Sequence, residues 1–127
     1  MNKSFTVFSI SIITISIILG AIAAHSLEKI VSESLLLSFE KGVKYMMYSG
    51  LGLLTISLNS DKFSFNIVWS VRLIAIGTIL FSGNIFLYIF HEHVPELKNF
   101  VHLVPVGGLL MIIGWSILLF GTIRSSK

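Results

Sequence analysis

Cysteine is absent from this chain of 127 residues, and charged residues are scarce, at 12% of the sequence. Without a thiol, the protein cannot form disulfides, hold a metal through thiolates or use a cysteine nucleophile. An average soluble domain carries about 25% charged residues, whereas 54% of this chain is hydrophobic. The composition therefore excludes an ordinary soluble protein and a soluble catalytic module.

The chain also lacks a contiguous basic surface in its sequence, although its formal net charge is +3. The nine basic residues are scattered between apolar runs, whereas nucleic-acid binding needs a basic patch or stripe. We therefore expect no nucleic-acid partner. The positive-inside rule for membrane proteins explains the basic residues better.

Four apolar runs of helical length occupy residues 5–24, 43–58, 67–90 and 100–123. A membrane-spanning helix needs about 20 residues, so four spans leave only short connections and a single integral membrane domain over residues 1–127. The alternation expected of β-barrel strands is missing. The sequence predicts an all-α, polytopic membrane protein built as an antiparallel bundle of four transmembrane helices.

The first run has an alternative interpretation as a secretory signal peptide. It follows a basic residue, Lys3, and it contains the small-residue pattern of residues 21–23, which is typical of a cleavage site. Its apolar core is long for a signal peptide, so we expect an uncleaved first span.

A stripe of apolar residues leads into the second run, with Leu27, Val31, Leu35, Phe39 and Val43 recurring every four positions. Acidic and basic residues occupy the other faces, which is typical of an amphipathic helix. We expect a short interfacial amphipathic segment before the second span. It either packs at the membrane surface or senses lipid or a partner there.

Basic residues are distributed almost evenly between the two sides of a four-span chain. Five lie with the termini and four lie opposite: Lys3, Lys62, Arg72, Arg124 and Lys127 against Lys29, Lys41, Lys44 and Lys98. This small bias favours cytoplasmic termini. We expect a multi-pass protein of the bacterial inner membrane with both termini cytoplasmic, and dual insertion stays open.

The side opposite the termini receives five of the six acidic residues and all four histidines: Glu28, Glu33, Glu40, Glu92, Glu96, His25, His91, His93 and His102. Imidazole suits Zn, Cu or Ni, and carboxylates can complete such a site. The four histidines are therefore candidate metal ligands. In the simpler interpretation they are polar residues at the membrane interface, since the two side chains of His91-x-His93 would diverge on a helix.

Small residues recur at helical spacing in the first and fourth runs. They are Ser16, Gly20 and Ala24 every four residues, and Gly107, Gly114 and Gly121 every seven, with Gly83 and Gly108 as further candidates. In lipid, where apolar burial does not drive helix association, close backbone approach along such faces favours packing.

Three polar residues fall inside the third run, namely Arg72, Ser82 and Asn84. Arg72 lies near one end and can reach the interface, so a topological anchor is expected, with a buried functional cation as the alternative. Asn84 is deeper and needs an interhelical partner, or it lines a pathway. Pro105 either occupies the first turn of the fourth helix or bends it.

Several segments carry a family resemblance, in the same order along the chain. Residues 20–27 (GAIAAHSL) look like the motif GAFGAHGL, and residues 80–84 (LFSGN) look like LFSGS. Residues 104–108 (VPVGG) with Gly114-Trp115 look like TPIGG…GW, and residues 39–54 (FEKGVKYMMYSGLGLL) resemble an aromatic start of the second helix. The chain thus resembles the domain of unknown function 423 family, which is similar to transmembrane protein 256.

The resemblance implies a small four-helix inner-membrane protein whose biochemical role is not established. The sequence departs from the family pattern at three positions. Ser49 stands where the family usually has a second histidine, Asn84 where it has serine, and Val104 where it has threonine. A mechanism that needs a histidine on the second span is therefore weakened here.

Two functions follow from the sequence. The first is a binding or accessory role, in which the bundle packs against lipid, a second copy or a larger membrane complex. The alternative is a proton or divalent-metal transporter or channel that uses the histidines and glutamates. We expect neither an enzyme nor a cofactor, because His25, Ser26 and Glu28 have suitable chemistry but no diagnostic spacing.

Overall fold

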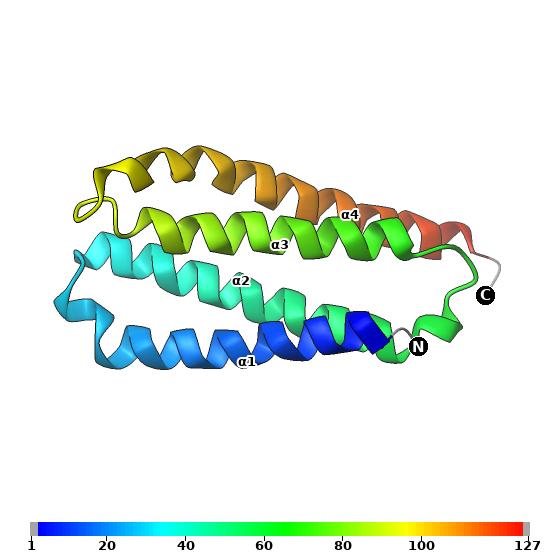
Figure 1. The fold of residues 1–127 in the computed structure, drawn as a ribbon. Helices are drawn as coiled ribbons and strands as arrows, with labels where there is room; N and C mark the ends of the chain where they lie inside the picture. The colour runs from blue at the N-terminus through cyan, green and yellow to red at the C-terminus, as the bar shows by residue number, and fades with distance from the viewer. Residues whose placement is uncertain (1–2, 126–127) are drawn as a thin grey trace.

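The computed structural model describes residues 3–125 and consists of four long helices (Figure 1). These are α1 (Lys3–His25), α2 (Glu33–Leu58), α3 (Val68–Tyr88) and α4 (Val104–Arg124). Short 3-10 helices precede α2, α3 and α4, namely η1 (Leu27–Lys29), η2 (Ser60–Lys62) and η3 (Pro95–Leu103). Lys127, which contributes to the charge bias, lies outside the described residues. The predicted all-α architecture is confirmed.

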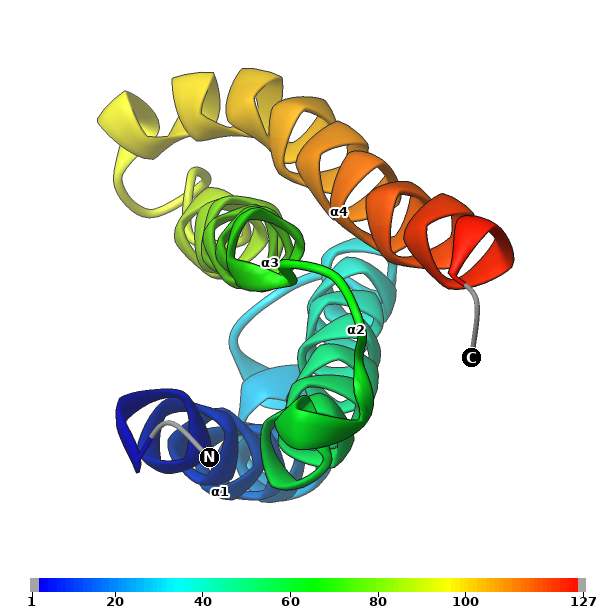
Figure 2. The same ribbon diagram turned by 90° about the vertical axis from the view of Figure 1, so that its right-hand side faces the viewer.

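The helices run antiparallel, and each packs beside its neighbour in sequence, so that both chain ends lie at the same end of the bundle (Figure 1). Figure 2 shows α1 and α4 as the two outer members, with α2 and α3 between them. α1, α3 and the continuous segment from Pro95 to Arg124 are long and apolar enough to cross a membrane. α2 is comparably long and packs against both α1 and α3.

The amphipathic stripe before the second span does not form a separate surface segment. α2 already begins at Glu33, and Leu27, Val31, Leu35 and Phe39 are buried in one cluster with Ile85 and Ile89 of the third helical segment. The charges at this end of α2 made it resemble a surface helix. Packing of its apolar stripe against α3 instead joins it to the second span.

The fourth span also differs from its expected bounds. Residues 95–103 form a 3-10 helix that includes the first four residues of the predicted span, and α4 begins at Val104 rather than at residue 100. Pro105 occupies the first turn of α4, where a missing N–H costs no intrahelical hydrogen bond. The helix therefore starts without an unwound segment.

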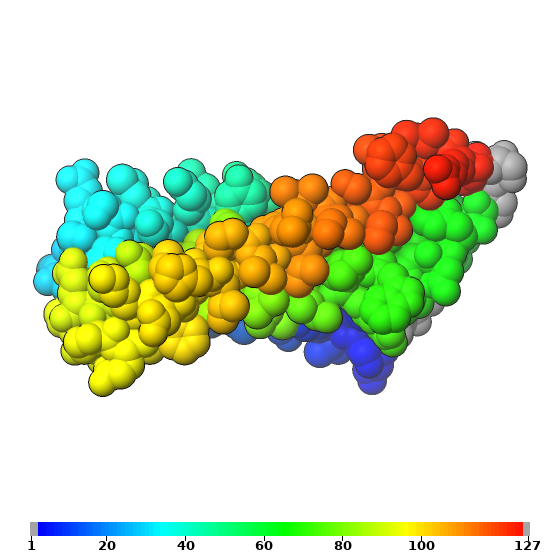
Figure 3. Space-filling model, turned by 90° about the horizontal axis from the view of Figure 1, so that it is seen from above, coloured from blue at the N-terminus to red at the C-terminus, as the bar shows by residue number. Residues whose placement is uncertain are grey.

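Glycine sets the distance between α3 and α4. A Cβ built on Gly107 would lie 2.7 Å from the carbonyl oxygen of Gly77, and one built on Gly114 would lie 2.9 Å from the carbonyl oxygen of Ser70. A Cβ at Gly121 would overlap the ring of Phe65. The two backbones therefore touch along the glycine face of α4, which crosses α3 diagonally (Figure 3).

Two of the small residues named above do not lie at a helix contact. A Cβ added to Gly83 would have no neighbouring atom within 4 Å, and Ala24 is exposed, whereas Ala23 is buried. A Cβ on Gly20 would make only ordinary contact with Val43, at 3.7 Å. The buried face of α1 follows Ser9, Ile12, Ser16 and Ala23, so the helix is rotated relative to the expected Ser16–Gly20–Ala24 stripe.

The polar side chains of α3 are satisfied in different ways. Ser82 Oγ donates to the carbonyl oxygen of Gly42 at 2.7 Å and so joins α3 to α2. Asn84 Nδ2 donates to Leu80 O at 2.6 Å within its own helix, so the expectation of an interhelical bond from Asn84 was wrong. The side-chain amide of asparagine, like the hydroxyl of serine, can donate to the backbone oxygen four residues earlier in the same helix. Arg72 is exposed and lies 5.4 Å from the ring centroid of Trp69.

Replacing Gly107 with alanine should destabilise the protein, because the new methyl group would meet backbone atoms of α3 that cannot rotate away. Overpacking of this kind costs about 1–3 kcal/mol. Gly83→Ala is the matched control, since its methyl group enters open space and glycine in a helix is about 0.5–1 kcal/mol less favourable than alanine. Thermal unfolding in detergent should show a lower Tm for G107A only. Equal Tm values for the two variants would contradict the close approach.

Replacing Ser82 with alanine should weaken the contact between α3 and α2 by removing the hydrogen bond to Gly42. Interhelical hydrogen bonds in membranes contribute about 0.6 kcal/mol on average and about 1.7 at most. Ser11→Ala is the control, because the Ser11 hydroxyl is exposed and bonds within α1. Unfolding by steric trapping or denaturant should give a lower free energy of unfolding for S82A than for S11A. The reverse order would rule out the role given to Ser82.

Candidate functional site

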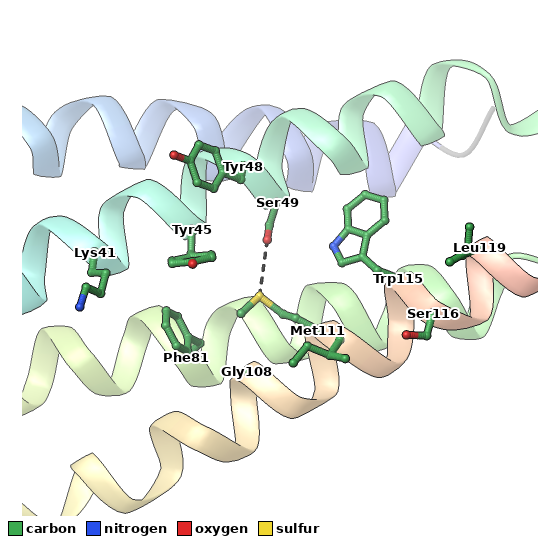
Figure 4. Close-up of a pocket in the computed structure, with 11 residues that line it drawn as sticks. Lys41, Tyr45, Tyr48, Ser49, Phe81, Gly108, Met111, Trp115, Ser116 and Leu119 are labelled. Carbon is green, nitrogen blue, oxygen red and sulfur yellow. Dashed lines mark hydrogen bonds between the residues drawn. The ribbon is translucent and has the colours of Figure 1, made fainter.

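A groove of about 730 Å³ lies between α2 and α4, over α3 (Figure 4). It arises because α4 is held against α3 and diverges from α2. Its size falls within the range of about 300–1,000 Å³ typical of ligand sites. Its walls come from α2, α3 and α4: Lys41, Tyr45, Tyr48, Ser49, Phe81, Gly108, Met111, Ile112, Trp115, Ser116 and Leu119.

Met111 lies where the three helices meet at the floor of the groove. Ser49 Oγ on α2 donates to Met111 Sδ at 3.6 Å (Figure 4). Thr78 Oγ1 on α3 lies 3.5 Å from the same sulfur and also donates to Ile74 O at 2.7 Å. A thioether is a weak acceptor, so this junction satisfies the two hydroxyls without placing a charge in the floor.

Aromatic side chains form much of the wall. Tyr45 packs edge-on against Phe81, with ring centroids 5.3 Å apart, and against Tyr48 at 5.7 Å. Trp115 extends from α4 towards α2, where its ring would lie 2.7 Å from a Cβ added to Gly52. The indole therefore bridges α2 and α4, and the glycine makes room for it.

Lys41 is the one charged residue among those that line the groove. It is exposed and lies at one end of the groove, towards the end of the bundle opposite the termini (Figure 4). Lys44 is also exposed, but it does not line the groove. The groove is therefore apolar along its length and cationic at one end.

The histidines lie at the same end of the bundle as Lys41, but in different environments. His25 ends α1 and is exposed, as is His102 in η3. His91 stacks on Tyr88 with ring centroids 4.4 Å apart, and its Nδ1 lies 2.8 Å from Tyr88 O. His93 Nε2 lies 3.1 Å from Ile30 O and so joins the α3–η3 connection to the α1–α2 connection.

No metal site is assembled from these residues. Within residues 3–125, no three His, Asp or Glu side chains lie close enough together to hold a metal ion. His91 instead contacts the ring and the backbone oxygen of Tyr88, and His93 contacts the backbone oxygen of Ile30.

The sequence did not reveal the groove, because its lining residues share no motif or spacing. Tyr45, Tyr48 and Ser49 lie in the resemblance segment of the second helix, and Trp115 lies in that of the fourth. Lys41 lies in the same segment of the second helix, and its charge was considered only in the comparison of basic residues on the two sides of the membrane. The one feature of the sequence that could have indicated the groove is that α4 carries glycines on one face and an aromatic residue, Trp115, on the adjacent face.

Comparisons with known proteins agree with this architecture. A family model described as "Protein of unknown function (DUF423)" matches residues 19–108. A UPF0382 membrane protein of Staphylococcus haemolyticus is 33% identical over 122 residues, which cover 96% of this chain and 97% of that protein. UPF0382 membrane proteins of Staphylococcus epidermidis and Staphylococcus aureus are 36% and 37% identical over 105 residues, covering 83% of each chain. No solved structure matches.

The family match and these relatives span most of the chain, in keeping with the motifs of the sequence. The chain therefore belongs to the DUF423 family, and the relatives to which it is similar are named membrane proteins.

Proposed function

We propose that this protein is a binding or accessory protein of the membrane, and that the groove between α2 and α4 is its binding site. The observation that carries the proposal is the groove itself, about 730 Å³ in volume and lined by aromatic and aliphatic side chains. It lies along the helices of a membrane bundle, where the neighbouring medium is lipid. Its guest is an elongated apolar group that enters from the bilayer.

Dispersion contacts favour a guest that fits such a groove closely. Side chains that face a void lose dispersion contacts with atoms on the other side. Tyr48, Ile112 and Leu119 are all more than half exposed in the isolated chain, at 59%, 64% and 56%. A guest lying in the groove restores these contacts.

The alternative of proton or metal transport needs ligands that converge on a path. Within residues 3–125, no group of three or more His, Asp or Glu side chains could hold a metal ion, and the charged residue of the groove is a lysine. We therefore favour binding over transport and over catalysis. We further propose a bacterial inner membrane location with cytoplasmic termini, on the small excess of basic residues at that side.

The groove should capture a discrete guest in native membranes. A photoreactive benzoylphenylalanine in place of Tyr48 faces the groove, whereas the same residue in place of Trp69 lies on an exposed part of α3 that does not line it. After irradiation, intact-mass analysis should show one dominant adduct for the Tyr48 variant. The Trp69 variant should give several weak adducts of different mass.

Identical adduct patterns at the two positions would show that the groove has no preferred guest. That outcome would refute the proposed function. A single protein adduct or a single lipid adduct at Tyr48 supports it.

A further inference from the structure

We infer that the guest is a phospholipid with an anionic headgroup, its phosphate beside Lys41 and one acyl chain along the groove. The inference rests on the proposed function, because it names the chemical class of the guest.

The length of the groove suits one acyl chain. Along α4 it extends from Gly108 to Leu119, which is about 16 Å at a helical rise of 1.5 Å per residue. The hydrocarbon core of a bilayer is about 30 Å thick, so the groove covers about the depth of one leaflet. Its walls between these ends are apolar or aromatic apart from Ser49 and Ser116.

The charge lies where a headgroup would be. Lys41 is eight residues inside the start of α2 at Glu33, about 12 Å along the helix axis, and its long side chain can extend towards the interface. It makes no ion pair with any residue of the described chain.

Trp115 argues against a helix of a partner or of a second copy as the guest. Its ring packs on Gly52 and bridges α2 and α4 across the groove. A helix with its side chains is about 10–12 Å wide and could not lie in the groove without displacing the indole. A single hydrocarbon chain is far thinner and can pass beside the ring.

The headgroup decides which lipid binds. Lipid tails are as apolar as the groove walls, so burial of the chain gives little preference over the surrounding bilayer. The ammonium group of Lys41 adds a preference for negative charge. One lysine near a membrane surface favours anionic lipid by about five-fold.

Native mass spectrometry of the full chain, ejected from nanodiscs of equal parts phosphatidylglycerol and phosphatidylcholine, tests this inference. The native protein should retain one phosphatidylglycerol in preference to phosphatidylcholine. Lys41→Gln should lower the ratio of retained phosphatidylglycerol to phosphatidylcholine about five-fold. Lys44→Gln is the matched control, because it removes the same charge three residues away outside the groove.

Equal retention ratios in native protein and K41Q would overturn the inference, as would an equal fall in K41Q and K44Q, which would indicate general surface charge. Both lysines are exposed, and matching Tm values would show that the variants fold. A single protein adduct in the Tyr48 photocrosslinking experiment would overturn the lipid assignment and leave the binding function standing. A native protein that retains no lipid, with no discrete crosslink, would refute both.

Discussion

Direct contact between the backbones of α3 and α4 determines how the four helices are arranged. Gly77 on α3 faces Gly107 on α4, and Gly114 lies against the backbone of Ser70. In lipid, helices gain little from apolar burial, and close approach of backbones is a main source of association. α4 is thereby fixed to α3 along its length, while hydrophobic clusters and the Ser82–Gly42 hydrogen bond fix α2 to α3 on another face.

The groove is a consequence of these two attachments. α2 and α4 both pack on α3, but α4 crosses it diagonally, so the space between α2 and α4 is bridged only by side chains, with Met111 at the floor and Trp115 across the gap. The aromatic residues that remain uncovered there, with Lys41 at one end, give the groove an amphipathic character like that of a phospholipid. The proposed binding role thus follows from packing geometry rather than from a reactive group.

The sequence was sufficient for the architecture, because four apolar runs, short connections and lipid as solvent leave few alternatives to a helical bundle. It was insufficient where tertiary packing decides. The first third of α2 carries charged residues and was therefore predicted to be a surface helix. In the structure its apolar stripe packs against Ile85 and Ile89. Asn84 bonds within its own helix, and Gly83 faces open space. Residue spacing alone does not determine how a helix is rotated about its axis relative to its neighbours. The groove could not be predicted, since it depends on the crossing of α4 over α3.

Oxygen accessibility of spin labels along α4 in bilayers would show whether α4 packs on α3 and leaves its side towards α2 open to lipid. The chain has no cysteine, so each introduced cysteine gives a single labelled position. Met111 and Leu118, which are buried, should show low accessibility to oxygen, and Ile112 and Leu119, which are exposed along the groove, should show high accessibility. Equally low accessibility at all four positions would show that protein covers the groove, and would rule out a groove that is open to lipid.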